Sequence, residues 1–160
     1  MSNAIARDDG PVTIRSANAA DLPAIESLLQ SSSLPTDGVK EALTNFLVAE
    51  SGAEIVGSIG MEYVGGCALL RSAAVSAKHR GHGVARRLTE EIIARARSRG
   101  VESVYLLTTT AEAYFPKFGF EVVPRHVAPP EIRATGEFTG TCPASATLMT
   151  LSLSGPAKHR

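Results

Sequence analysis

The chain has 160 residues, a length typical of one compact domain and too short for two. Its 16 lysine and arginine residues balance its 16 aspartate and glutamate residues, so no overall charge draws it to nucleic acid or to a membrane. No apolar run approaches the roughly 18 residues of a membrane span, and residues 1–10 lack the apolar stretch of a signal peptide. We therefore expect a soluble cytoplasmic protein with two reduced cysteines, Cys67 and Cys142.

Apolar and β-branched runs in the first half of the chain predict strands and two helices, preceded by a polar tail at 1–10. The helix that begins near Asp21-Leu22-Pro23 has a carboxylate and a proline in its first turn, and Ile25, Leu28 and Leu29 share one of its faces. In chain order, the expected elements are a strand at 12–15, this helix, a shorter helix at 37–43, and strands at 46–50, 54–63 and 69–76.

The clearest pattern lies in the second half, where Val84, Leu88, Ile92 and Ala96 recur every four positions until Gly100 ends the run. This spacing predicts an amphipathic helix whose arginine residues face solvent. The elements expected after it are a strand at 101–107, a short helix at 111–118, strands at 121–123 and 147–153, and a polar tail at 154–160. Strands that outnumber helices predict one α/β (α+β) domain over 11–153, with a mixed sheet and helices on both of its faces.

A glycine-containing segment, Arg80-Gly81-His82-Gly83-Val84-Ala85, lies between a predicted strand and this helix. The first N–H groups of a helix have no carbonyl partners within it, and glycines let the backbone approach a ligand closely, so the segment can hold a pyrophosphate. Arg80, Arg86 and Arg87 add positive charge. The segment matches neither a P-loop nor a dinucleotide fingerprint, and an ordinary glycine-rich turn is the alternative.

Arg80, Gly83 and Ala85 match a coenzyme A loop of the form Arg/Gln-x-x-Gly-x-Gly/Ala, and residues 111–120 match a second signature ending in Lys-x-Gly-Phe. With these motifs and its order of elements, the sequence resembles the GCN5-related N-acetyltransferase (GNAT) superfamily. The resemblance implies a mostly antiparallel sheet of about six or seven strands and acetyl-coenzyme A as co-substrate, without a metal. The residues that it implies for coenzyme binding are Ala73, Ala74, Val75, Arg80, Gly81, His82, Gly83, Val84, Ala85 and Arg86.

Several further segments resemble the ArsN-type acetyltransferases of arsenic resistance within this superfamily. They are Leu34-Pro35-Thr36, Leu69-Leu70-Arg71-Ser72, residues 106–110, Ile132-Arg133-Ala134-Thr135 and residues 142–146. The early Leu-Pro and the late Cys-Pro are also similar to short amino-acid N-acetyltransferases of the N-acetylglutamate synthase kind. Both resemblances imply a small amino-acid-like amine as acceptor, and the ArsN type extends this to an arsenic- or phosphorus-containing mimic of glutamate.

Acetyl transfer to an amine requires a base, because an alkyl amine is mostly protonated near neutral pH. Glu62, at the end of a predicted strand, is the candidate base, and a solvated surface carboxylate is the alternative. Tyr114 is the candidate acid for the departing thiolate, although the superfamily's usual tyrosine aligns with Phe115, and plain packing is its alternative. A backbone N–H near Ala74 or Val75 would hold the oxyanion.

Arginine residues are the candidates for an anionic group of the acceptor, because a guanidinium pairs two carboxylate oxygens at once. Arg71 interrupts a strand that we expect to be enclosed, so its partner is either a carboxylate of the chain, such as Glu62 or Glu137, or an anion of the substrate. Arg133, in a predicted loop, is the second candidate. The remaining acceptor candidates are Ser72, Thr108 and Ser145 for hydrogen bonds and, for trivalent arsenic, the single thiol of Cys142.

Three classes of function fit these observations. They are a small-molecule N-acetyltransferase, a protein N-terminal or lysine acetyltransferase, and a coenzyme A-binding module without turnover. We expect the first, an acyltransferase whose partners are acetyl-coenzyme A and a small amine rather than nucleic acid or a membrane, and a homodimer is compatible with it.

Overall fold

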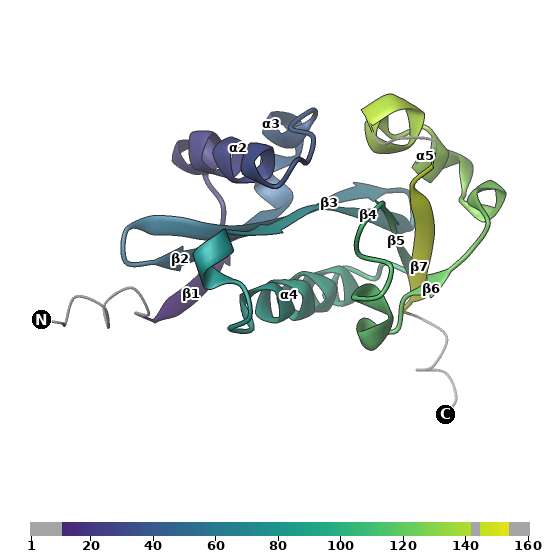
Figure 1. Cartoon of the computed structure of the whole chain (residues 1–160). Helices are drawn as coiled ribbons and strands as arrows, with labels where there is room; N and C mark the ends of the chain where they lie inside the picture. The colour runs from purple at the N-terminus through teal and green to yellow at the C-terminus, as the bar shows by residue number, and fades with distance from the viewer. Residues whose placement is uncertain (1–10, 142–144, 154–160) are drawn as a thin grey trace, which may run out of the picture. The chain divides into compact units, whose positions relative to one another are not determined.

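The computed structural model describes residues 11–141 and 145–153 (Figure 1). Its strands are β1 (Val12–Ser16), β2 (Phe46–Ser51), β3 (Glu54–Val64), β4 (Cys67–Val75), β5 (Ser103–Thr108), β6 (Glu121–Val122) and β7 (Thr147–Ser152). Its α-helices are α2 (Leu22–Ser31), α3 (Val39–Ala42), α4 (Val84–Ser98) and α5 (Pro130–Arg133). Shorter 3-10 helices are η1 (Ala19–Asp21), η2 (Leu43–Asn45), η3 (Ala77–His79), η4 (Phe115–Phe118) and η5 (Arg125–Val127), and η6 (Glu137–Thr141) is a π-helical turn. The predicted tails at 1–10 and 154–160, and Cys142, lie outside the described residues.

Hydrogen bonding arranges the seven strands in the order β1-β2-β3-β4-β5-β7-β6. β4 pairs with β5 in parallel, whereas the β1/β2, β2/β3, β5/β7 and β6/β7 pairs are antiparallel. This mixed, mostly antiparallel sheet confirms the predicted fold class. The chain packs as two compact units: an N-terminal unit formed by the chain up to Gly60 with Ser72–Thr89, and a C-terminal unit formed by Met61–Arg71 with the chain from Glu90 onward.

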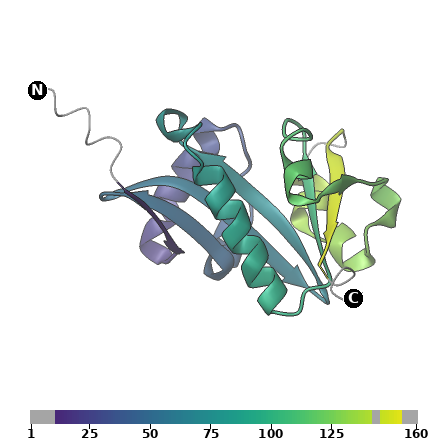
Figure 2. The ribbon, with the colours of Figure 1, turned by 90° about the horizontal axis from the view of Figure 1, so that it is seen from below.

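The core of the N-terminal unit follows from the alternation of side chains along β2. Phe46 and Val48 belong to one buried cluster with Ile25 and Leu29 of α2, because every second side chain of a strand points to the same face. Figure 1 shows α2 and α3 on this side of β2 and β3, with the start of α4 on the other, and Figure 2 shows α4 crossing the strands. Two layers of helix therefore enclose the sheet here, as predicted.

The start of α4 approaches β3 closely at Gly57. A Cβ atom at this glycine would lie 3.0 Å from Cδ1 of Leu88 and 3.3 Å from Cγ1 of Val84. These two residues are buried, as are Ile92 and Ala96, so the four-residue repeat predicted for this helix faces the core along its whole length. Gly57 thus sets how near the first turn of α4 lies to the sheet.

The core of the C-terminal unit contains Leu69 of β4 and Leu148 of β7, which pack against Ala128 and Ile132. Ile132 is fully buried and belongs to α5, in a stretch for which the sequence predicted no element. Pro130 occupies the first turn of α5, where a missing N–H is tolerated. The short helix thus covers one side of the strands in this unit.

Several predicted elements differ from the structure in their bounds. The strands predicted at 69–76 and 101–107 are β4 and β5, which begin two residues earlier and two residues later, and the helix predicted at 37–43 is α3 followed by η2. The helix predicted at 111–118 is reduced to η4, because Pro116 has no N–H to donate and is accommodated only in the first turn of a helix, and residues 112–114 before it form turns. Gly119 then adopts a φ of 101° and ends η4. The strand predicted at 121–123 is β6, which has two residues.

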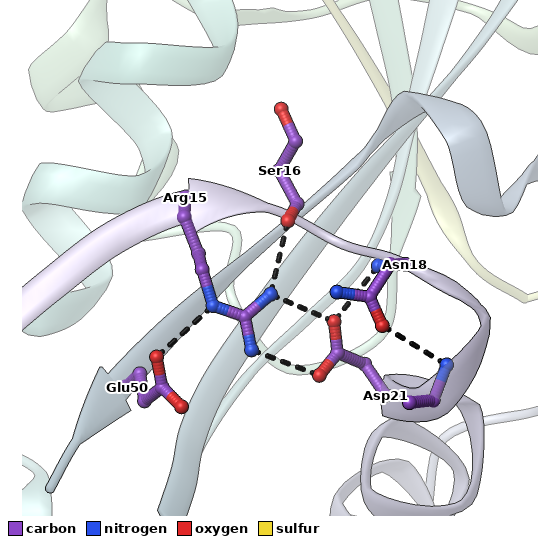
Figure 3. Close-up of polar contacts among 6 residues, drawn as sticks. Arg15, Ser16, Asn18, Asp21 and Glu50 are labelled. Atoms are coloured by element: carbon purple, nitrogen blue, oxygen red, sulfur yellow. Dashed lines mark hydrogen bonds and ion pairs between the residues drawn. The ribbon is translucent and has the colours of Figure 1, made fainter. Parts of the chain in front are cut away.

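A polar network ties β1 to the start of α2 (Figure 3). The Arg15 guanidinium donates to both carboxylate oxygens of Asp21, at 2.8 and 2.9 Å, and its Nε donates to Glu50 at 3.0 Å. The N–H of Asn18 also donates to Asp21, and the Asn18 side chain accepts the N–H of Ala20, which completes a capping box. Hydrogen bonding by Arg15 is the main cause that lowers the pKa of Asp21, against the opposing effect of burial.

We expect folding stability to fall as the pH drops below the ordinary aspartate pKa of about 3.9. A carboxylate whose pKa is lower in the folded chain stabilises the fold above its unfolded pKa, and this contribution is lost as the pH falls through the folded pKa. Asp21→Asn should lower the free energy of unfolding by about 2 kcal/mol at neutral pH and progressively less in acid. Urea unfolding across pH measures this, with Glu50→Gln as the control that keeps the Asp21 pair. Parallel pH curves for parent and Asp21→Asn would contradict the assignment.

Candidate active site

The predicted coenzyme segment joins β4 to α4 within the N-terminal unit. Gly81 and Gly83 both have a φ of 83°, in the left-handed region that favours glycine. No described heavy atom would lie within 4 Å of a Cβ at either position, so these glycines serve the backbone conformation and the space beside them is open. α4 begins at Val84, whose side chain is buried, so only its main chain is left for contact with a ligand. The segment has the open, N–H-rich form that an anion requires.

Hydrogen bonds hold this segment against the end of β4. Arg80 donates from Nε to the carbonyl of Val75 at 3.0 Å, and Oγ of Ser76 lies 2.8 Å from Nδ1 of the buried His79. Arg80 therefore shapes the loop as well as adding charge. Of the predicted coenzyme residues, the exposed ones are Ala73, Arg80, Gly81, His82, Gly83 and Arg86, the buried ones are Ala74, Val75 and Val84, and Ala85 is half-buried.

Positive charge is concentrated around the segment although the chain as a whole has a formal net charge of zero. The stretch 77–89 contains no aspartate or glutamate. Its basic residues are Lys78, His79, Arg80, His82, Arg86 and Arg87. Lys78 has an exposed partner in Glu54, at the limiting distance of 4.0 Å, and such a pair contributes little in water. The loop is thus a local anion-attracting feature of the N-terminal unit.

Arg71, on β4, is 4% exposed and is bound by two carboxylates of the C-terminal unit. Its Nη1 lies 2.6 Å from Oε2 of Glu62 on β3, and its Nη2 lies 3.3 Å from Oε2 of Glu137 in η6. The two carboxylates that the sequence offered as partners are therefore both used. Two carboxylates on one guanidinium give this group a formal excess of one negative charge.

Tyr114 lies at the start of η4 among aromatic rings. Its ring centroid is 5.2 Å from that of Phe115 and 5.3 Å from that of Phe118, both at steep interplanar angles, and Nζ of Lys117 lies 4.4 Å from the Tyr114 centroid. These contacts give the side chain a packing role. Phe115 is buried against Phe120.

The other acceptor candidates of the C-terminal unit have different surroundings. The hydroxyl of Thr108 accepts N–H groups of the turn after β5, including that of Ala111. Arg133 is exposed at the end of α5, and Ser145 is exposed in the turn before β7. Ser72 belongs to the N-terminal unit and has a φ of 59° inside β4. Within the C-terminal unit the structure brings together Glu62, Arg71 and Glu137.

Two features escaped the sequence analysis. Ser58, on β3, is fully buried and donates its hydroxyl to the carbonyl of Ser72 at 2.9 Å. The sequence feature that could have indicated it is a serine inside the otherwise apolar run from Ile55 to Met61. The Ser76–His79 contact beside the coenzyme segment was the second, and nothing in the pattern of the sequence indicates that His79 is buried.

Two absences apply to the described part of the chain. No group of three or more His, Cys, Asp or Glu side chains there is placed to hold a metal ion. No described helix has both the length and the apolar character needed to cross a membrane.

Cys67 is a free thiol, and burial, together with the charges of Glu102 and Glu131, raises its pKa.

Comparison with known proteins agrees with this geometry. The family model described as an acetyltransferase (GNAT) domain matches residues 42–122, half of the chain. That stretch runs from the end of α3 to β6 and includes β4, the coenzyme segment and α4. The chain therefore belongs to the GNAT acetyltransferase domain family.

Solved structures of low sequence identity share the fold. N-acetylglutamate synthase from Neisseria gonorrhoeae, complexed with coenzyme A and N-acetyl-glutamate, is 22% identical with a TM-score of 0.77 over 90% of this chain and 35% of that one. Rv2747 from Mycobacterium tuberculosis, in complex with CoA and NLQ, is 22% identical with a TM-score of 0.72, covering 88% and 99%. The ribosomal-protein-S18-alanine N-acetyltransferase from Escherichia coli is 20% identical with a TM-score of 0.70, covering 90% and 95%. The chain spans about a third of the length of the synthase.

Proposed function

We propose that the chain transfers the acetyl group of acetyl-coenzyme A to the amine of a small amino-acid-like acceptor. The observation that carries this proposal is the loop between β4 and α4, where two glycines of positive φ leave open space beside the first N–H groups of the helix. The pyrophosphate of the coenzyme would lie on residues 81–86, and the pantetheine and acetyl portion along the main chain of Ala73, Ala74 and Val75. A backbone N–H near Ala74 or Val75 would stabilise the oxyanion.

Glu62 is the proposed base for the acceptor ammonium. Its side chain is 22% exposed, so solvent reaches it, and its Oε2 is held by Arg71 at 2.6 Å. Proton transfer would therefore take place at Oε1, directly or through one water molecule. Tyr114 is the proposed donor to the departing thiolate. The ring of Tyr114 is packed among aromatic side chains, so its substitution would disturb packing as well as proton donation. Substitution of Glu62 therefore tests the proposed chemistry more directly.

Glu62→Gln should lower turnover about 100-fold, with the largest loss at low pH, where more of the amine is protonated. Steady-state rates of parent and variant from about pH 6 to pH 9 measure this. Glu137→Gln is the matched control. It also removes a carboxylate from Arg71, but Glu137 is not the group proposed to accept the proton of the amine. An identical pH profile for parent and Glu62→Gln would make Glu62 a partner of Arg71 and nothing more.

The acceptor is proposed to be acidic, in the range from glutamate to its arsenic- or phosphorus-containing mimics. Arg71 supports this proposal by its chemistry, but its two carboxylate partners mean that an anionic acceptor has to take the place of one of them. Glu137, at 3.3 Å, is the more distant partner. Arg133, exposed at the end of α5, is the second proposed contact, with Ser72, Thr108 and Ser145 as hydrogen-bonding groups.

Arg71→Lys should raise the KM for acidic acceptors about 10-fold, because a lysine loses the fork of N–H donors. The KM for an uncharged amine of similar length should change much less. Kinetics on glutamate, on a phosphinic or arsinic analogue and on the uncharged amine measure this difference. Equal losses on all three would show that Arg71 supports the fold and does not read the acceptor.

Release of free thiol from acetyl-coenzyme A, with a panel of amino acids and a panel of peptides, tests the function itself. The proposal expects release with amino-acid-like amines. Release with peptides alone would indicate a protein acetyltransferase, and coenzyme binding without release from either panel would indicate a binding module. Either result contradicts the proposed function.

A further inference from the structure

β4 contains a conformational irregularity at Ser72. Its φ of 59° lies in the left-handed region, and the only other described non-glycine residue with a positive φ is Ser33, after α2. A side chain makes this conformation unfavourable, so the surrounding structure has to hold it. Ser72 is directly followed by Ala73, Ala74 and Val75, whose main chain is the proposed site of the acetyl group.

The pairing of β3 with β4 shows what the irregularity does. The two strands flank a two-residue turn, Gly65-Gly66, so continuous pairing would place Val56 opposite Val75. The N–H that donates to the carbonyl of Val56, at 2.8 Å, is instead that of Ser76, one residue further along. β4 therefore carries one extra residue, a β-bulge at Ser72. A shift of one residue reverses the direction of every following side chain and N–H group.

Ser58 is the side chain that binds this bulge. It lies on the neighbouring strand β3, is fully buried, and donates its hydroxyl to the carbonyl of Ser72 at 2.9 Å. A buried hydroxyl has to find an acceptor inside the protein, and the carbonyl of a bulge residue is out of step with the regular ladder. The bond therefore fixes the peptide plane between Ser72 and Ala73.

We propose that Ser58 is a positioning residue for acetyl transfer. This role rests on the proposed function. The Ser58 hydroxyl holds the bulge of β4 so that one main-chain N–H, that of Ala74 or Val75, points at the carbonyl oxygen of the acetyl group. The residue touches neither coenzyme nor acceptor. It acts through one peptide plane, and the conformation of that plane decides whether an oxyanion finds its donor.

Ser58→Ala should lower kcat about 10-fold or more while the KM for acetyl-coenzyme A stays close to that of the parent. Amide hydrogen exchange in the peptide covering residues 72–76 should become faster in the coenzyme-free protein. Thr150→Val is the matched control, because Thr150 also donates a hydroxyl to a carbonyl on a neighbouring strand, that of Val104 at 3.1 Å. It should leave kcat and the exchange of residues 72–76 unchanged.

Two substitutions of equal size separate the hydrogen bond from packing. Ser58→Thr keeps the hydroxyl and should retain more of the parent kcat than Ser58→Val, which has a methyl group in its place. Equal kcat for these two variants, or unchanged exchange in Ser58→Ala, would overturn the proposal, as would faster exchange with an unchanged kcat. If the parent itself releases no thiol, the proposed function fails, and the exchange rates alone still decide whether Ser58 fixes the bulge.

Discussion

Gly83→Asp is expected to weaken the binding of acetyl-coenzyme A by about 3 kcal/mol, roughly 150-fold. The new carboxylate would stand in the open space beside the first turn of α4, where the pyrophosphate is expected. The negative charges of the new carboxylate and of the pyrophosphate would be close neighbours, and such charges repel strongly when the site is partly shielded from water. Calorimetric titration of acetyl-coenzyme A into parent and variant measures the loss.

A control is needed because aspartate at a φ of 83° also strains the backbone. Gly100→Asp introduces the same residue at a φ of 81°, again without a described atom within 4 Å of the new Cβ. Gly100 follows the C-terminal end of α4, whereas Gly83 precedes its start. The control should lose stability but bind coenzyme as the parent does. Equal affinities for parent and Gly83→Asp would remove the basis for placing the pyrophosphate here.

Arg71→Met is expected to lower the free energy of unfolding by about 3 kcal/mol. Removing the guanidinium leaves the carboxylates of Glu62 and Glu137 without their shared cation, and the Glu137 side chain is only 9% exposed. A buried charge that loses its partner is strongly unfavourable. Guanidinium chloride unfolding at neutral pH measures the change.

The second substitution Glu137→Gln should restore part of that loss, because it removes one of the two stranded charges. A double-mutant cycle over Arg71→Met and Glu137→Gln gives their coupling directly. We expect the double variant to be more stable than Arg71→Met alone. If Glu137→Gln costs as much stability in the Arg71→Met background as it does in the parent, the coupling is zero and the 3.3 Å contact between Arg71 and Glu137 contributes nothing to stability.

Local pattern and residue type made α4 and the turn before it predictable. The four-residue repeat of α4 is a property of one short stretch, and the glycines before it announce a turn that only a few backbone conformations satisfy. Asn18 and Asp21 also have the spacing of a capping box, of which the carboxylate alone was enough to predict the helix start. Features of this kind depend on residues close together in the chain.

The partners of Arg71 depend on distant residues and could be named only as alternatives. Glu137 lies far along the chain in a π-helical turn, and such turns have no reliable sequence pattern. The bulge at Ser72 was hidden for a different reason, because serine normally avoids a positive φ and so gives no warning there.

Contacts within the chain hold the loop before α4. Arg80 binds the carbonyl of Val75, Ser76 contacts His79, and Leu88 lies close against Gly57. A loop held by such contacts gives up little chain entropy on binding, so for the proposed pyrophosphate site the encounter itself should limit the rate of association. Because the surrounding charges are all cationic over 77–89, that rate should slow as salt is added, while the rate of departure stays nearly constant.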